Sequence, residues 1–499
     1  MDLALNVAGG FAQAFSATNL LYCFIGVTLG TLIGVLPGIG AMLGISLLLP
    51  VTFYLPPDAA IIMIAGIYYG GEYGGSITSI LINLPGSASS AVTCLDGYQM
   101  AKKGRAAVAL YVTAMASFIA GSFGILLMTL FSPLIASFAL SFTSVDYFAV
   151  MLLGLIASST VGRGSPLKSV AALVVGVLFG SIGTDVNTGL ARYSMGFPEL
   201  ITGVGVAVLA MGLFGLPEVI TGVGEEDGHT QAKRVRIRDM LPTRDEVRRS
   251  AAPLVRGTGI GSLLGVLPGT GATISAFLAY SFEKRVSREP QRFGHGAIEG
   301  VVAPESANNA AAQTGFIPTL TLGIPGSATM ALILGALMIH GIPPGPQFMT
   351  DHSDLFWALV ASFWVGNLFL LVLNIPLVGI WVKLLQIPYR YMFPAIVCLI
   401  CVGVYSVNLN TFDIWLVLII GLVGCGMRIC GFEAAAFLMG FILGPLMEEN
   451  LRRALLLGRG DFTVFLKSPI SLTCFALTIL LLVWPYISRY LRRNRMAEA

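Results

Sequence analysis

Two glutamates differ sharply in chemistry from the residues around them. Glu72 lies in GGEYGG and Glu305 in APESANNAA, and both stretches are otherwise apolar or rich in glycine and alanine. Ionisable side chains in such stretches are functional candidates, because a buried charge is costly unless it is paired. We predict that both glutamates bind a coupling cation, Na⁺ or H⁺. Hydrogen bonding between neighbouring helices is the alternative role for either carboxylate.

Two copies of the sequence P-G-S-A, at residues 85–88 and 325–328, carry a second kind of chemistry. In each copy Pro-Gly interrupts an apolar stretch, and small hydroxyl side chains follow. A half-helix that begins there presents free N–H groups and the positive end of its dipole, which suits an anion. The apolar runs contain no obvious Arg or Lys to pair with a carboxylate, so we expect dipoles, hydroxyls and bound cations to recognise it. A packing kink is the alternative interpretation.

The predicted solute-binding residues come from these two loops and from a neighbouring pair of asparagines. Asn308 and Asn309 are adjacent, so on a helix they point about 100° apart and only one of them faces a given site. The predicted set is Gly86, Ser87, Ser89, Asn308, Asn309, Gly326, Ser327 and Thr329.

The sequence L-P-G-x-G also occurs twice, at residues 36–40 and 267–271. Proline and glycine interrupt helical hydrogen bonding there, and the exposed carbonyls suit Na⁺. A hinge is the alternative interpretation. The G-x-G spacing is not a dinucleotide fingerprint, because no strand precedes it. Together with the two glutamates, the predicted cation-binding residues are Gly38, Gly40, Glu72, Gly269, Thr270, Gly271 and Glu305.

The composition indicates the kind of elements that position these residues. The chain has 499 residues, of which 56% are hydrophobic and 11% charged, and its mean hydropathy is +0.83. Many apolar runs reach the ~20 residues that span a bilayer. We therefore predict an all-α polytopic membrane protein with broken or re-entrant helices. The net charge of +3 gives no indication of a nucleic-acid partner. The sequence has no His cluster, P-loop or G-x-S-x-G motif, which argues against an enzyme or an ATPase.

The two kinds of loop belong to an internal duplication. GTLIGVLPGIGA at residues 30–41 returns as GSLLGVLPGTGA at 261–272, and ILINLPGSA at 80–88 returns as LTLGIPGSA at 320–328. The offsets are 231 residues, from Pro37 to Pro268, and 240 residues, from Pro85 to Pro325. We predict a first repeat half over residues 1–222, a cytoplasmic linker over 223–253 and a second repeat half over 254–499.

Loop charges predict that the two halves are inverted. The loop after the first L-P-G motif, VTFYLPPDAA, has no Lys or Arg, whereas its counterpart, SFEKRVSREPQRFGHG, has four. After the P-G-S-A motifs the distribution of basic residues is reversed. The segment AKKGR of the first half has three Lys or Arg residues, and its counterpart, GIPPGPQFMTDHSD, has none. Basic loops are typically cytoplasmic, so corresponding loops face opposite sides, as in inverted-topology repeats. MEENLRRALLLGRGD, at residues 447–461, conflicts with this count, and an interfacial amphipathic helix is one explanation.

Three substitutions and one control substitution express these expectations. Ser87→Ala and Ser327→Ala should each weaken solute binding by about 0.5–1.5 kcal/mol, or up to ~3 for a bond to a charged group. Gly326→Val should do more harm, on the expectation that Gly326 has a backbone conformation open to few other residues. Ser117→Ala, on an ordinary span, should be nearly silent and serve as the control.

The long motifs resemble one family over almost the whole chain. GTLIGVLPGIG, YYGGEYGGSITSILINLPGSASS, LDGYQMAKKGRA, GHGAIEGVVAPESANNAAAQTGFIPTLTLGIPGSA and GPLMEENLRRAL are similar to the large membrane subunit of the tripartite tricarboxylate transporter family. The resemblance implies a multi-pass protein of the bacterial inner membrane with roughly 12 spans, each needing ~20 apolar residues.

The resemblance also implies partners and an activity. The partners are a small membrane subunit of about four spans and a periplasmic solute-binding protein. The implied activity is uptake of citrate or other carboxylates on an ion gradient, typically of Na⁺, without a cofactor. A stand-alone ion-coupled transporter or a channel for another small solute is the alternative. Paired broken helices and the absence of charge rings argue against a channel.

Overall fold

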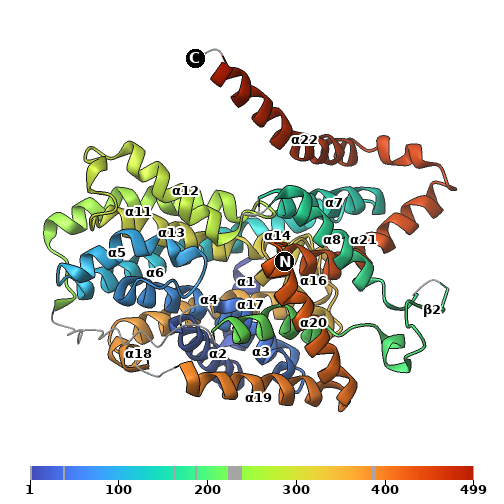
Figure 1. Ribbon diagram of the computed structural model, residues 1–499, viewed down its shortest axis with the longest axis horizontal. Helices are drawn as coiled ribbons and strands as arrows, with labels where there is room; N and C mark the ends of the chain where they lie inside the picture. Colours follow the sequence, from blue (N-terminus) through green and yellow to red (C-terminus); the bar gives the residue numbers. More distant parts are fainter. Residues whose placement is uncertain are drawn as a thin grey trace.

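The computed structural model describes residues 3–36, 40–161, 165–185, 188–222, 239–384 and 389–497 (Figure 1). Most of these residues are helical. The strands among them are β1 (Gly183–Thr184) and β2 (Ala191–Arg192), which pair antiparallel. The predicted all-α class is confirmed for this part of the chain. Gly38 and residues 223–238 of the predicted linker lie outside the described residues.

The first half is a succession of apolar helices joined by short turns. Its elements are α1 (Leu3–Ala14), α2 (Ala17–Val35), α3 (Gly40–Thr52), α4 (Pro57–Ile82), η1 (Ser89–Ala91), α5 (Thr93–Lys102), α6 (Ala106–Ala139), α7 (Ser144–Val161), α8 (Pro166–Gly180), η2 (Pro198–Thr202), α9 (Val206–Ala210), the π-helical turn η3 (Met211–Gly215) and α10 (Leu216–Gly222).

The helices of the chain after residue 238 begin at Arg244, a residue within the predicted linker. The elements of this second half are α11 (Arg244–Gly265), α12 (Gly271–Val286), η5 (Pro290–Arg292), α13 (Glu299–Thr314), α14 (Phe316–Thr321), α15 (Ala328–Ile339), α16 (Pro346–Asp351), α17 (Ser353–Asn374), α18 (Val378–Leu384), α19 (Tyr389–Asn408), α20 (Thr411–Ile429), α21 (Ala434–Leu457), η6 (Phe462–Leu466) and α22 (Pro469–Ala497).

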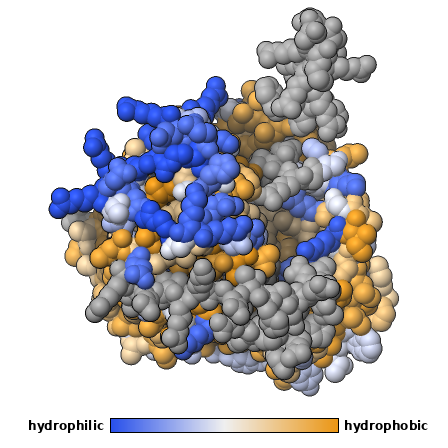
Figure 2. Space-filling view, turned by 60° about the vertical axis from the view of Figure 1, so that its left-hand side comes forward, coloured by the Kyte–Doolittle hydropathy of each residue, from blue (hydrophilic) through white to orange (hydrophobic). Residues whose placement is uncertain are grey.

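Helix length and surface hydropathy both fit a bilayer. Within the described residues five helices, α2, α6, α17, α20 and α21, are long and apolar enough to cross a membrane, and seven apolar helices are shorter. Large apolar side chains stay exposed on the long helices, for example Leu130 and Leu134 of α6 and Leu422 of α20. Figure 2 shows hydrophilic side chains gathered at one end of the molecule, beside a broad hydrophobic surface. The total of roughly 12 spans stays a prediction.

Helices α2 and α4 pack through glycines at every fourth position of α2. A Cβ atom built on any of these glycines would lie 2.3–2.4 Å from a backbone oxygen of α4, so the two backbones touch. Small residues at this spacing let membrane helices approach closely. The contacts are Gly26 with Met63, Gly30 with Ile67 and Gly34 with Gly71.

Helices α11 and α13 of the second half repeat this packing. A Cβ atom on the glycines of α11 would lie 2.1–2.6 Å from a backbone oxygen of α13. The contacts are Gly257 with Ala303, Gly261 with Ala307 and Gly265 with Ala311. The glycines are displaced from those of α2 by 231 residues and their partners from those of α4 by 240 residues, the same offsets as the two loop motifs. The duplication therefore extends from the motifs to the packing.

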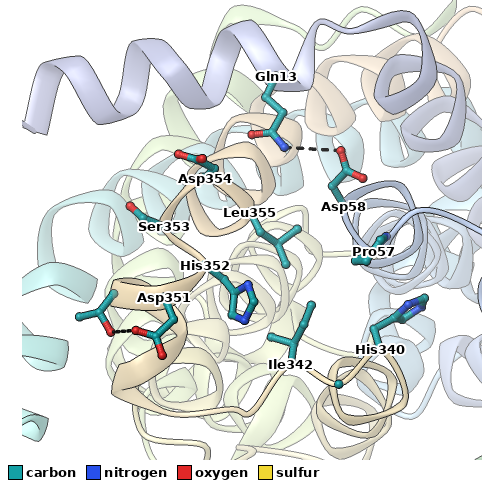
Figure 3. Close-up of a pocket in the computed structure, with 12 residues that line it drawn as sticks. Gln13, Pro57, Asp58, His340, Ile342, Asp351, His352, Ser353, Asp354 and Leu355 are labelled. Carbon is teal, nitrogen blue, oxygen red and sulfur yellow. Dashed lines mark hydrogen bonds between the residues drawn. The ribbon is translucent and has the colours of Figure 1, made fainter.

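Loops from the two halves meet in two places. The turn after α5 lies beside the loop after α12, where Lys103 Nζ donates a hydrogen bond to the His295 carbonyl at 2.6 Å. Elsewhere the start of α4, with Asp58, and the end of α15, with His340, line one pocket of about 480 Å³ (Figure 3). In both places, the loop after L-P-G-x-G of one half lies beside the loop after P-G-S-A of the other.

The basic segment that conflicts with the loop charges forms the last turns of α21. Arg452 lies 3.0 Å from Asp185 and 2.6 Å from Glu448, and Arg453 lies 2.5 Å from Glu449. These carboxylates offset the positive charges locally. The ion pairs do not alter the count of Lys and Arg residues, so this segment still conflicts with the predicted loop orientation.

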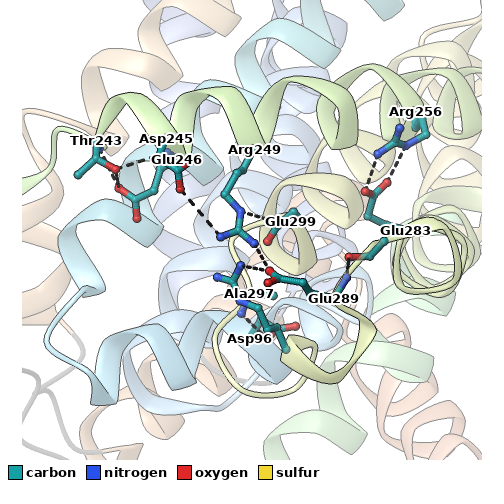
Figure 4. Close-up of polar contacts among 12 residues, drawn as sticks. Asp96, Thr243, Asp245, Glu246, Arg249, Arg256, Glu283, Glu289, Ala297 and Glu299 are labelled. Atoms are coloured by element: carbon teal, nitrogen blue, oxygen red, sulfur yellow. Dashed lines mark hydrogen bonds and ion pairs between the residues drawn. The ribbon is translucent and has the colours of Figure 1, made fainter.

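Asp96 of α5 joins the first half to the start of α13 in the second (Figure 4). Its carboxylate is fully buried, and Oδ1 accepts backbone N–H bonds from Gly294, Gly296 and Ala297 at 2.7–2.9 Å. Oδ2 accepts a bond from Tyr280 Oη at 3.0 Å. One side chain thus satisfies three donors of a loop that precedes a helix, where backbone N–H groups otherwise lack partners.

We expect Asp96→Ala to destabilise the protein strongly. Each buried donor left without a partner costs about 1–3 kcal/mol, so the loss should total about 3–5 kcal/mol. The thermal unfolding midpoint of the detergent-purified protein measures this. Asp245→Ala is the control, because Asp245 is 75% exposed and its nearest cation, on Arg249, is 3.9 Å away. Equal midpoints for the two variants would show that the Asp96 contacts contribute little.

Candidate functional site

One cavity of about 810 Å³ is lined by both P-G-S-A loops. The first residues of α3 and α12, which follow the two L-P-G-x-G loops, also line it. Ten predicted site residues are on its wall: Gly40, Glu72, Gly86, Ser87, Ser89, Gly269, Thr270, Gly271, Ser327 and Thr329. Gly326, Glu305, Asn308 and Asn309 are not on the wall, and Gly38 is outside the described residues. The structure thus brings together residues of four separate sequence motifs.

The two motifs of each half touch one another. In the second half, Gly269 N donates a hydrogen bond to the Gly326 carbonyl at 3.0 Å. In the first half, a Cβ atom on Gly40 would lie 3.6 Å from the Gly86 carbonyl oxygen. Gly40, Gly269 and Gly271 have φ of +65°, +81° and +53°, a conformation that favours glycine. The second L-P-G-x-G loop therefore contacts its own P-G-S-A loop, and Gly40, the described end of the first, lies close to the first P-G-S-A loop.

The second P-G-S-A loop opens a regular helix. Ser327 is the N-cap of α15, and its Oγ accepts a hydrogen bond from Met330 N at 3.3 Å. Capping leaves other N–H groups of the first turn without helical partners. This is the predicted half-helix N-terminus, and it faces the cavity through Ser327 and Thr329.

The first P-G-S-A loop differs, because a 3₁₀ turn and not an α-helix follows it. Ser87 N donates to Ser90 Oγ at 3.2 Å, and Ser90 Oγ donates to the Ser87 carbonyl at 2.9 Å. Serine side chains that bond to nearby backbone groups compete with helix formation. A helix N-terminus was predicted in both halves, whereas α5 starts only at Thr93. The first loop therefore presents hydroxyls to the cavity.

Glu72 lies on the cavity wall beside this first loop. Its carboxylate accepts a hydrogen bond from Ser89 Oγ at 2.5 Å, and Ser89 Oγ is 2.8 Å from Ser87 Oγ. The Asn308 amide approaches Glu72 outside hydrogen-bonding geometry. Asn308 is 1% exposed, and neither of its amide atoms has a hydrogen-bond partner among the described residues. Buried amides are normally hydrogen-bonded, so Asn308 is available for a ligand beside Glu72.

Glu305 is bonded on both carboxylate oxygens and lies off the cavity. It accepts hydrogen bonds from Ser76 Oγ at 2.7 Å and from Thr93 Oγ1, which tie α13 to α4 and α5. Asn309 Nδ2 donates to Ser117 Oγ at 2.7 Å. These contacts match the alternative role of hydrogen bonding between helices. Ser117 is fully buried and bonded to a predicted site residue, so it is not the neutral control that we expected.

Gly326 does not have the special backbone conformation that we expected, so the prediction of harm from Gly326→Val on that ground is wrong. Gly326 has no left-handed φ, and a Cβ atom there would lie 3.4 Å from its nearest neighbour, the Gly265 carbonyl oxygen. The crowded position is the equivalent glycine of the first half. A Cβ atom on Gly86 would lie 2.0 Å from the Gly34 carbonyl oxygen and 2.6 Å from Gly75 Cα.

A further wall of the cavity contains charged residues that sequence reasoning missed. It is formed by α10, by the end of α20 and by the start of α21, and it carries Glu218, Arg428 and Glu433. Arg428 Nη1 donates to Glu218 Oε2 at 2.9 Å. The expectation that no Arg or Lys is available to a carboxylate is therefore wrong. Arg428 lies at the end of an apolar run, in CGMRICGFE. Its position there is the feature of the sequence that could have identified it as a candidate site residue.

Comparison with known proteins assigns the chain to a family. The model of the tripartite tricarboxylate transporter TctA family matches residues 20–439, which include all four loop motifs. The chain belongs to this family. Membership makes it a component of a tripartite transport system and a multi-pass membrane protein, and the family is one of transporters and not of enzymes.

Two similar proteins come from Agrobacterium vitis. One, described as an uncharacterized 52.8 kDa protein in the TAR-I ttuC′ 3′ region, is 49% identical over 476 residues, which cover 95% of each chain. The other, described as an uncharacterized protein in the TAR-II ttuC′ 3′ region, is 54% identical over 223 residues, 45% of this chain and 92% of that protein. No solved structure matches the chain.

Proposed function

We propose that this chain is the large membrane subunit of a binding-protein-dependent secondary transporter in the bacterial inner membrane. It imports tricarboxylates or related carboxylates on an ion gradient, with Na⁺ as the coupling ion. Its partners are a small membrane subunit of about four spans and a periplasmic solute-binding protein. The observation that carries the proposal is the single cavity lined by both P-G-S-A loops and by Glu72.

The cavity offers donors for a carboxylate from two sides. The start of α15 supplies free N–H groups, a positive dipole end and the hydroxyls of Ser327 and Thr329. The first loop adds the hydroxyls of Ser87 and Ser89. Ser89 Oγ donates to Glu72 and Ser87 Oγ is hydrogen-bonded to Ser89 Oγ, so each hydroxyl must exchange its present bond to donate to the solute. Hydrogen bonds from such donors to a charged group are worth about 1.5–3 kcal/mol each.

The same wall offers oxygens for a cation. Glu72 supplies one carboxylate, and the glycine-rich loops beside it supply backbone carbonyls, the ligands that Na⁺ commonly takes at broken helices. A cation near Glu72 would also attract the solute carboxylate, which couples the two binding events. The amide of Asn308, which has no hydrogen-bond partner among the described residues, lies near Glu72 behind the cavity wall.

Two features support inverted repeats over residues 1–222 and 254–499. The glycine contacts of α2 with α4 return in α11 with α13 at the offsets of the loop motifs. The loop that follows L-P-G-x-G in one half meets the loop that follows P-G-S-A in the other, in both places. Inverted repeats bring equivalent loops together around one central site, and alternating access then moves the halves around it.

The test is uptake by liposomes that contain this chain with its small membrane subunit and the solute-binding protein. We expect labelled citrate or a related carboxylate to accumulate above its external concentration when a Na⁺ gradient is imposed. Accumulation should end when the Na⁺ gradient is dissipated and should not depend on ATP. Uptake that survives the loss of both Na⁺ and proton gradients but stops on ATP depletion would contradict the proposal. Entry without accumulation would favour the channel alternative.

A further inference from the structure

The cavity has one cationic side chain among the described residues that line it. Arg428 is in the last turn of α20, and its Nη1 lies 2.9 Å from Glu218 Oε2 of α10. The Arg428 side chain is 54% exposed and the Glu218 side chain 27% exposed. The ion pair therefore lies where the cavity meets solvent, on a different wall from the P-G-S-A loops.

Tight packing between the two helices fixes the position of this ion pair. A Cβ atom on Gly424, one turn before Arg428, would lie 2.9 Å from Pro217 Cγ, next to Glu218. A Cβ atom on Gly421 would lie 2.3 Å from Leu216 Cδ2. Because α20 and α10 are in direct contact here, the two charged side chains extend from a rigid base into the cavity.

Other charged groups near Arg428 are bonded elsewhere. Glu433, which also lines the cavity, accepts a hydrogen bond from Ser169 Oγ at 3.1 Å. Lys168 Nζ donates to the Cys430 carbonyl at 2.6 Å and lies over the Phe432 ring. The Glu218 carboxylate is thus the cavity-lining anion in contact with Arg428, and a solute carboxylate would take its place.

We propose that Arg428 binds a second carboxylate of the solute, which displaces Glu218, and that this exchange selects di- and tricarboxylates over monocarboxylates. The inference rests on the proposed function. A guanidinium binds a carboxylate through parallel N–H···O bonds, so replacing one carboxylate by another conserves the interaction. A monocarboxylate held at the P-G-S-A loops has no second carboxylate to offer. It leaves Arg428 paired with Glu218.

The direct test measures binding to the purified complex of this chain with its small membrane subunit, without the solute-binding protein. Citrate, succinate and acetate serve as tri-, di- and monocarboxylate. Arg428→Gln should weaken citrate and succinate binding roughly 10- to 150-fold, the range for a bond to a charged group. Acetate binding should change less than about 2-fold. Arg428→Lys, which keeps the charge but not the forked geometry, should give an intermediate loss for citrate.

Glu218→Gln separates solute binding from a structural role. If Glu218 competes with the solute for Arg428, its neutralisation should tighten citrate binding, whereas a structural ion pair predicts weaker binding from either substitution. Arg453→Gln is the matched control. Arg453 is a comparably exposed arginine, paired with Glu449 at 2.5 Å and away from the cavity, and its replacement should leave binding unchanged.

Two results would overturn the inference: unchanged citrate binding by Arg428→Gln, or a parallel loss of stability and citrate binding in both Arg428→Gln and Glu218→Gln. Ion-driven accumulation by the wild-type system separates these results from a failure of the proposed function. If the wild type accumulates citrate and the variants show either result, only the role of Arg428 fails. If the wild type neither binds nor accumulates a carboxylate, the proposed function fails and the inference fails with it.

Discussion

Gly86→Ala should reduce uptake roughly 5- to 150-fold, whereas Gly326→Ala should leave most of it intact. The two glycines occupy equivalent places in the two P-G-S-A loops, but only Gly86 is enclosed. The added methyl group would lie 2.0 Å from the Gly34 carbonyl oxygen and 2.8 Å from Thr78 Oγ1. The first of these neighbours is backbone held in the contact of α2 with α4, so the loop must move away. Overpacking of this kind typically costs about 1–3 kcal/mol.

The measurement is uptake at matched protein levels in the membrane, together with the thermal unfolding midpoint. The Gly326 variant is an internal control, because it adds the same methyl group at the equivalent position, where the nearest atom would be 3.4 Å away. Similar activity in the two variants would show that displacement of the first loop does not impair transport. It would remove the first loop from the site.

Glu72→Gln should raise the concentration of the coupling ion that uptake requires, whereas Glu305→Gln should leave that concentration unchanged. The substitution keeps the shape of the side chain and removes its charge. Glu72 lies on the cavity wall with one hydroxyl donor, so its charge is available to a cation. Glu305 lies off the cavity, and its two oxygens are taken by Ser76 and Thr93.

The Na⁺ concentration for half-maximal uptake is the quantity to measure. The loss of one charged ligand, at about 1.5–3 kcal/mol, should raise it roughly 10- to 150-fold in Glu72→Gln. In Glu305→Gln the expected change is in the thermal unfolding midpoint, since the buried bonds between α13, α4 and α5 weaken. If Glu305→Gln instead shifts the Na⁺ requirement and Glu72→Gln does not, the two roles are exchanged.

The duplicated motifs were sufficient to predict which loops come together. P-G-S-A and L-P-G-x-G return in the same order, and a duplicated fold places duplicated loops at equivalent positions. The different roles of the two glutamates could not be predicted in this way. The offset of 240 residues leads from Glu72 to Ala312 and from Glu305 back to Ala65, so neither carboxylate has a counterpart in the other half. Only the three-dimensional contacts distinguish them.

Local side-chain chemistry and helix packing explain the other features of the site that the sequence did not predict. The serines at positions 87 and 90 bond to one another's backbone, which replaces the first turn of a helix with a 3₁₀ turn, and a Pro-Gly pattern does not reveal this. Arg428 lies at the end of its run, where an arginine ordinarily faces the aqueous phase. Its place on the cavity wall depends on how α20 packs against α10, a contact between segments about 200 residues apart.

The glycine contacts of α2 with α4 and of α11 with α13 determine where the protein can change shape. Backbones in direct contact have no intervening side chains to adopt new rotamers, so neither pair can slide internally without a clash. Each pair must then travel as a rigid body during a transport cycle. Relative displacement is left to surfaces where side chains separate the backbones. The π-helical turn η3, immediately before α10, is packed against α20 as closely, since a Cβ atom on Gly212 would lie 2.6 Å from Ile420 Cγ2, so η3, α10 and α20 form a third body that moves as one.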